Sequence, residues 1–346
     1  MPGKLMRYSG LITKTRAMSG NLLTKDELRQ LTEFVTVNDA INYLKSMGGY
    51  NSVYQGRDGD WHRGQAEAAS IKSLYQDFEK LYRFADANQR LAFEYVFFRY
   101  ETDILKQCLK CLFRQKKEEV EIYTDEFFEK HICFSIDNLR KATSIQEVEQ
   151  MLAGTVYEEV FLQMQDSERL AYVDYAMKLD CFYYKSVFDA IKRMKESELK
   201  KILLEIYGTQ IDWLNIMWIY RSKRFYQQSL KEIYAMIIPA FYRVRKEEFD
   251  KLIAASDLTE MNRILSETSY LKGKDAFVKM EYEISYRKII EAMYQRVSRK
   301  YAVSIAPVLK YIYEKEQEIK RLTTIIEGIR YQLPARDIKD LVMITA

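Results

Sequence analysis

The sequence predicts an all-α protein made of three similar helical domains that form a funnel-shaped socket with pseudo-threefold symmetry. Only four prolines and twelve glycines occur among 346 residues, and so few helix breakers favour nearly continuous helix. A pattern of about 108 residues is also written three times along the chain, which is longer than the roughly 20 to 50 residues of a solenoid unit. Each copy is therefore expected to be a small helical domain with a short-helix half and a long-helix half.

The short-helix half of each copy is marked by one set of residues at matching spacings. A leucine is followed by a helix-starting residue, a carboxylate three residues later, a second leucine and a closing tyrosine. The three sets are Leu31, Thr36, Asp39, Leu44 and Tyr50; Leu139, Ser144, Glu147, Leu152 and Tyr157; and Leu252, Asp257, Glu260, Leu265 and Tyr270. This is the pattern of a capping box, in which the starter accepts an N–H of the first turn and the carboxylate reaches back.

The long-helix half carries a second repeated signature. Asp103, Asp212 and Glu318 each open an apolar stretch that ends in basic residues. These carboxylates could be ordinary residues near a helix start, where the helix dipole favours them. Alternatively, three equivalent carboxylates and three basic ends could surround a pseudo-threefold axis and meet a partner. The residues alone favour neither interpretation over the other.

The order of the elements follows from local patterns. Residues 1–50 predict short helices with a turn at Gly48-Gly49, and the glycine-rich residues 51–65 predict a loop. In the long helices that follow, Leu74, Phe78, Leu81 and Phe84 form an amphipathic stripe.

The later elements are punctuated by the few prolines. Pro239 is expected to kink or begin a helix, Pro307 to interrupt the last long helix or sit in its first turn, and Pro334 to precede a new helix. A chain of this length exceeds a single core. We expect three helical repeat domains, 1–117, 118–230 and 231–346.

Composition and motifs argue against catalysis and against cofactors. Cys108 and Cys111 lie in an apolar helical stretch and predict core packing, while His62 and His131 have no acidic motif nearby. No phosphate loop occurs, and Gly56–Asp60 lacks the order of a calcium loop. No metal or cofactor is expected, and the nearly balanced charge of +4 does not predict nucleic-acid binding.

The location is also suggested by composition. No stretch of 18 apolar residues occurs, so no transmembrane segment is expected. The start of the chain does not resemble a signal peptide. Four cysteines in so long a chain fit a reducing cytoplasm rather than a disulfide framework.

Two segments give the chain a family resemblance. Residues 211–216 (IDWLNI) lead to 220–223 (YRSK), and residues 316–322 (EQEIKRL) lead to 327–334 (EGIRYQLP). At these motifs the sequence resembles the C subunit of the bacterial and archaeal V-type (A-type) ATPases, the relative of the eukaryotic d subunit. The resemblance covers essentially the whole chain, although the first copy departs from the pattern with Lys106 in place of the asparagine.

The resemblance implies a non-catalytic structural component of a rotary ATPase or ATP synthase. Such a protein is a central-stalk adaptor that lies at the cytoplasmic face of the membrane. Its partners are the central-stalk subunits and the membrane rotor ring of c-type (proteolipid) subunits, and it couples rotation to proton or sodium transport. On this basis Asp103, Asp212, Asn215, Arg221 and Glu318 are expected to line the funnel wall and shape the stalk socket.

Two other classes remain as alternatives. A free-standing helical scaffold would bind a soluble protein partner and have no affinity for a membrane ring. An all-helical prenyl-chain synthase would need an Asp-Asp-x-x-Asp cluster, which the sequence lacks, so we rank it last.

Overall fold

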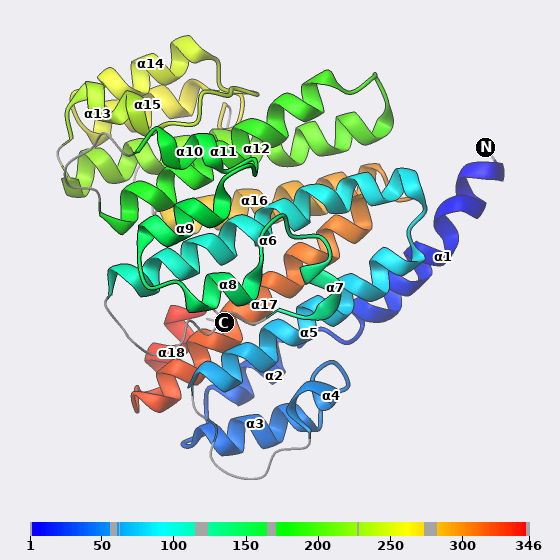
Figure 1. Ribbon diagram of the computed structural model, residues 1–346. Helices are drawn as coiled ribbons and strands as arrows, with labels where there is room; N and C mark the ends of the chain where they lie inside the picture. Colours follow the sequence, from blue (N-terminus) through cyan, green and yellow to red (C-terminus); the bar gives the residue numbers. More distant parts are fainter. Residues whose placement is uncertain are drawn as a thin grey trace. The chain divides into compact units, whose positions relative to one another are not determined.

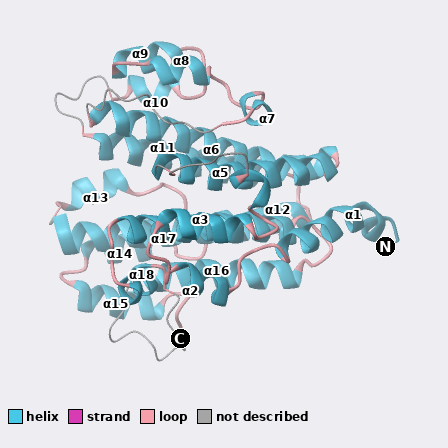
Figure 2. Ribbon diagram, turned by 90° about the horizontal axis from the view of Figure 1, so that it is seen from below, coloured by secondary structure: helices cyan, strands magenta, loops and turns pink. Residues whose placement is uncertain are grey.

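The structure, a computed structural model, describes residues 2–55, 61, 63–114, 124–164, 171–226, 228–272 and 282–343. Every regular element within these ranges is a helix (Figures 1 and 2), which confirms the all-α prediction. Gly56–Asp60, His62 and the predicted boundary between the first two domains, at residue 117, lie outside the described residues.

The chain begins with one long helix, and the other long helices follow as three consecutive pairs. The first helix is α1 (Pro2–Ser19), and the three pairs are α5 (Arg63–Phe84) with α6 (Ala87–Phe113), α11 (Tyr172–Arg193) with α12 (Glu198–Arg221), and α16 (Tyr282–Lys300) with α17 (Ala306–Arg330). Pro307 lies in the first turn of α17, which is one of the two predicted alternatives. A π-helix, η1 (Ser222–Tyr226), directly continues α12.

Short helices precede each pair and form what we call the three lobes. Lobe 1 holds α2 (Lys25–Leu31), α3 (Val37–Lys45) and α4 (Asn51–Tyr54); lobe 2 holds α7 (Glu126–Glu129), α8 (Ile136–Lys141), α9 (Ile145–Leu152) and α10 (Glu158–Leu162); lobe 3 holds α13 (Leu230–Met236), α14 (Lys246–Ala254) and α15 (Leu258–Glu267). The last helix, α18 (Ala335–Leu341), starts directly after Pro334, as predicted.

The predicted helix starters Thr36, Ser144 and Asp257 are the N-caps of α3, α9 and α15. In each case the side-chain oxygen accepts the backbone N–H of the carboxylate residue three positions later, at 2.8 to 3.2 Å. The returning half of the box differs, because Asp39 accepts from the Thr36 hydroxyl and Glu260 accepts from the N–H of Ser256. The cap itself is therefore confirmed in all three copies.

The described chain divides into two compact units, and each unit combines segments from different sequence repeats. Unit 1 consists of Met1–Phe97, Lys116–Thr143 and Val303–Ala346, and unit 2 consists of Phe98–Gln115 and Ser144–Ala302. The repeat domains 1–117, 118–230 and 231–346 stay a prediction about the sequence. Helix α6 runs from one unit into the other.

In unit 1, lobe 1 packs on the last long helix of the chain. Leu31, Leu44 and Tyr50 share one apolar cluster with residues of α17 such as Leu322 and Ile325. Helix α5 also lies alongside α17 (Figure 1). Burial of this cluster stabilises unit 1, at about 25 cal/mol for each Å² of apolar surface removed from water.

In unit 2, lobe 3 packs on α12 in the same manner. Leu252, Leu265 and Ile253 share a cluster with Trp213 and Ile216 of α12. In the first and third copies the repeated leucines therefore pack on a long helix from another part of the sequence.

Three local predictions are wrong in part. Phe84 belongs to the predicted apolar stripe, but it is the last residue of α5 and is 56% exposed, whereas Leu74 and Leu81 are buried. Residues 51–54 of the predicted loop form α4. Pro239 neither kinks nor begins a helix, because residues 237–245 are held as a non-helical segment by side chains of α12.

Candidate functional site

Each closing tyrosine of the repeat donates a hydrogen bond to a carboxylate on a long helix. Tyr50 donates to Glu318 at 2.6 Å, Tyr157 to Glu101 at 3.2 Å and Tyr270 to Asp212 at 2.9 Å. The helices that supply these carboxylates are α17, α6 and α12. Lobes 2 and 3 thus contact the second long helix of the preceding repeat, and lobe 1 contacts that of the last repeat.

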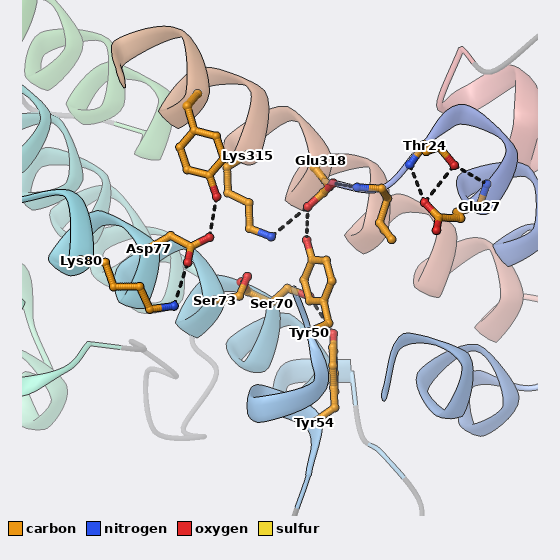
Figure 3. A network of polar contacts seen from close by, with 12 residues as sticks. Thr24, Glu27, Tyr50, Tyr54, Ser70, Ser73, Asp77, Lys80, Lys315 and Glu318 are labelled. Atoms are coloured by element: carbon orange, nitrogen blue, oxygen red, sulfur yellow. Dashed lines mark hydrogen bonds and ion pairs between the residues drawn. The ribbon is translucent and has the colours of Figure 1, made fainter. Parts of the chain in front are cut away.

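The contact on Glu318 is the centre of a buried network in unit 1 (Figure 3). Its carboxylate accepts from Tyr50, from the backbone N–H of Leu23, and from the Lys315 ammonium at 2.8 Å. Lys315 is only 1% exposed, and its ammonium lies 3.9 Å from the centre of the Tyr50 ring. Burial and the neighbouring carboxylate raise the pKa of the Tyr50 phenol well above its ordinary value. The phenol therefore stays a proton donor.

A second polar contact joins α5 and α17 near this network. The Tyr311 hydroxyl donates to Asp77 at 2.6 Å. Lys80 pairs with the other oxygen of that carboxylate at 3.1 Å (Figure 3). Burial and the charge of Asp77 raise the pKa of Tyr311. Unit 1 is thus held by two carboxylates that each accept a tyrosine hydroxyl.

Asp212 organises unit 2 by accepting four hydrogen bonds. The donors are the backbone N–H groups of Tyr242, Arg243 and Val244, at 2.7 to 3.1 Å, and the Tyr270 hydroxyl. Burial raises the pKa of the Asp212 carboxyl, and the four donors offset this in part. The predicted site residue is fully buried and holds backbone of lobe 3 rather than facing solvent.

Asn215 lies one turn further along α12 and holds the same segment. Its amide is bidentate to Ile238, accepting from the N–H at 2.8 Å and donating to the carbonyl at 2.9 Å. Lys223, in the π-helix, donates to the carbonyls of Ile253 and Ala255 at the end of α14. Three polar side chains of one helix and its extension therefore anchor lobe 3.

The first copy departs from the predicted alignment. Asp103 is half-exposed and pairs with Lys106 at 2.7 Å, and Lys106 also pairs with Asp180 at 2.7 Å. The carboxylate that receives the closing Tyr157 is instead Glu101, which is buried. The sequence analysis did not identify Glu101. Its place two residues before Asp103 made it a possible alternative partner for Tyr157.

Arg221 is the predicted site residue with the most exposed setting. It ends α12 and forms an ion pair with Glu283 at 2.9 Å, with both side chains largely in solvent. The five predicted residues therefore have different surroundings: Asp212, Asn215 and Glu318 are buried, and Arg221 and Asp103 reach the surface.

The remaining chemistry-bearing residues are used in packing. Cys108 is fully buried on α6, and burial raises the pKa of its thiol to about 12, so it is a poor nucleophile. His131 stacks on Phe97 with ring centres 4.1 Å apart. Within the described ranges, no group of three or more His, Cys, Asp or Glu side chains could hold a metal ion.

Comparisons with known proteins find similar sequences over almost the whole chain. Residues 11–341 match the protein family described as ATP synthase (C/AC39) subunit. The chain is 25% identical over 331 residues to the A-type ATP synthase C subunit of Methanobrevibacter smithii, covering 91% of this chain and 82% of that protein. The protein of the same name from Methanosarcina acetivorans is 24% identical over 97% of this chain and 93% of its own length. That of Thermococcus kodakarensis is 23% identical over 98% of this chain and 91% of its own.

Proposed function

Because the chain belongs to the ATP synthase (C/AC39) subunit family, we propose that it is the central-stalk adaptor of a rotary ATPase or ATP synthase. In this role it couples the rotary stalk to the membrane ring of c-type subunits and so to proton or sodium transport. Family and relatives name a structural component rather than a catalytic one. No described helix is both long and apolar enough to cross a bilayer.

The observation that best supports this proposal is the way the lobes are fastened. Asp212, Asn215 and Lys223 tie lobe 3 to α12, and Glu318 ties lobe 1 to α17. Buried or half-buried side chains that are hydrogen-bonded to their partners, as these four are, make an assembly rigid. A part that transmits torque between two partners needs such stiffness and needs no nucleophile.

The finer architecture is part of the same proposal. Three repeats, each with a lobe and a pair of long helices, would surround a pseudo-threefold axis as a funnel at the inner face of the membrane. Of the five predicted interface residues, Arg221 and Asp103 have the exposure to touch the stalk. Asp212, Asn215 and Glu318 would act through the segments that they hold.

The proposal is tested with purified components. The chain is expected to bind both the isolated stalk subunits and the detergent-solubilised ring, and to be required for the stalk to bind the ring, as measured by biolayer interferometry and pull-down. Binding to neither component would reject the adaptor role. Recovery of a soluble partner without any ATPase component would favour the alternative, a free-standing scaffold.

The predicted socket is tested with an exposed residue. Arg221→Glu should weaken binding of the stalk, because it reverses a surface charge and leaves the buried contacts of α12 intact. Arg263→Glu is the matched control, since Arg263 also forms a surface ion pair, with Glu267 at 3.0 Å. Unchanged stalk affinity in Arg221→Glu, with an unchanged helical circular dichroism spectrum, would remove Arg221 from the site. Asp212 is unsuitable for this test because its replacement would orphan four donors.

A further inference from the structure

An arginine and an aromatic residue follow the tyrosine-binding carboxylate at the same offset in all three copies. Counting from Glu101, Asp212 and Glu318, positions twelve and thirteen always hold one of each. The three pairs are Phe113-Arg114, Arg224-Phe225 and Arg330-Tyr331. The register is visible only when Glu101, rather than Asp103, is taken as the first carboxylate, so the structure was needed to find it.

In the second copy the pair lies in the π-helix that continues α12, in the third it lies at the end of α17, and in both copies it is exposed. Phe225 and Tyr331 are each 60% exposed. The guanidinium of Arg224 lies over the Phe225 ring at 5.4 Å, and that of Arg330 lies over the Tyr331 ring at 5.1 Å. In the described part of the chain, neither arginine forms an ion pair with a carboxylate.

The helix dipole explains the arginine of each pair but not the exposed aromatic residue beside it. A basic residue in the last turn of a helix is favoured by the helix dipole. That effect gives no reason to place a large aromatic ring in solvent beside it. In α12, moreover, the chain reaches this register through the π-helix Ser222–Tyr226, and such segments are rare and frequently functional.

The first copy is a weaker version of the same element. Arg114 is exposed, but the order of the two residues is reversed, and Phe113 is partly buried against Tyr175 with ring centres 5.6 Å apart. Phe225 also contacts a tyrosine, Tyr220, with ring centres 6.1 Å apart, yet it stays 60% exposed. In the first copy only the arginine is therefore available to a partner. Only the second and third pairs expose both an arginine and an aromatic ring.

We propose that these exposed arginine–aromatic pairs are contact elements for the membrane ring, and that each binds a carboxylate lying beside an apolar side chain on a ring loop. A guanidinium with no carboxylate of its own suits an acidic group, and the ring beside it suits apolar contact. One element repeated along a chain fits a partner that repeats its own surface, as a ring of identical subunits does. A single stalk has no such repetition. This inference rests on the proposed function.

The experiment uses the full chain and the detergent-solubilised ring. The test variant is Arg224→Glu/Arg330→Glu, and a second variant, Phe225→Ala/Tyr331→Ala, removes the rings and keeps the charges. The control is Arg16→Glu/Arg299→Glu, which makes the same charge change at two exposed arginines in the last turns of α1 and α16. Kd values for ring and stalk are measured at low and high salt.

The charge-reversal variant should bind the ring at least about tenfold more weakly at low salt, with a smaller loss at high salt because exposed charges are screened. The alanine variant should weaken ring binding at every salt concentration, and the control should stay within about twofold of wild type. Stalk binding should be unchanged in all three. Loss of stalk binding with ring binding retained, or no effect on either, would overturn the inference and leave the adaptor role standing. A wild-type chain that binds neither partner would instead reject the adaptor role itself.

Discussion

The buried pair Lys315–Glu318 allows a sharp test of how lobe 1 is held on α17. Replacing Glu318 with glutamine keeps an acceptor for the N–H of Leu23 and a partner for the Tyr50 hydroxyl, but it removes the negative charge that the Lys315 ammonium contacts directly. Lys315 is 1% exposed. Leaving one partner of a buried ion pair uncompensated costs about 3 to 5 kcal/mol.

The double variant Lys315→Met/Glu318→Gln separates charge from packing. It removes both charges and fills the space of the lysine stem, while the glutamine oxygen still accepts from the N–H of Leu23 and its NH2 group donates to the Tyr50 oxygen. Replacement of a buried ion pair by well-packed neutral groups is often nearly neutral, so the double variant should lie within about 2 kcal/mol of wild type. It should be more stable than Glu318→Gln alone.

Amide hydrogen exchange followed by mass spectrometry measures how much each variant changes the local stability of lobe 1. In Glu318→Gln, peptides covering Val37–Tyr54 should exchange at least about a hundredfold faster, since each 1.4 kcal/mol is a factor of ten. Lobe 3 provides the internal control, because its carboxylate contact, Asp212 with Tyr270, is untouched. Equal exchange in wild type and Glu318→Gln would refute the role of the charge, and so would a double variant no better than the single one.

Two further outcomes follow from local geometry. Hydrogen bonding to Arg7 lowers the pKa of the Asp86 carboxyl to about 2, so its contribution to stability is complete above pH about 4 and is lost as the pH falls toward 2. In acid denaturation, Asp86→Asn should reduce the change in unfolding free energy across that window by about 1 kcal/mol, a small value because the pair is half-exposed. An unchanged pH dependence would contradict this. Gly208→Ala should lower the free energy of unfolding by about 1 to 3 kcal/mol, because a Cβ there would lie 2.4 Å from the Tyr242 ring. Gly10→Ala, where a Cβ meets nothing within 4 Å, should instead raise it by about 0.5 to 1 kcal/mol; in a urea titration, equal shifts for both variants would refute the packing argument.

Local chemistry made part of the fold predictable. Thr36, Ser144 and Asp257 are caps because a short polar side chain before a helix satisfies an orphan N–H whatever lies elsewhere in the chain. Pro307 and Pro334 act where they do because proline lacks an N–H and presets its own backbone angle. Such features depend on residues within one turn.

Features that depend on distant partners were not predictable. Local rules place Pro239 in a helix or at its start. In the structure, Asn215 and Asp212 on α12 accept backbone N–H groups of the segment around Pro239, which is therefore held in a non-helical conformation. The sequence favours Asp103 over Glu101, because only the position of Tyr157 distinguishes them. For the same reason burial of the expected interface residue Asp212 was not foreseen, since its four donors lie 30 to 58 residues away.

The pairing of lobe 1 with α17 sets an order of events when the chain is made. Tyr157 and Tyr270 follow their carboxylates by 56 and 58 residues, so those lobes find a finished helix as they emerge. Tyr50 precedes Glu318 by 268 residues. At about 5 to 20 residues per second of synthesis, lobe 1 waits roughly 15 to 50 s with its apolar face uncovered. The first lobe to leave the ribosome is therefore the last to dock, and until then it is the part of the nascent chain most in need of a chaperone.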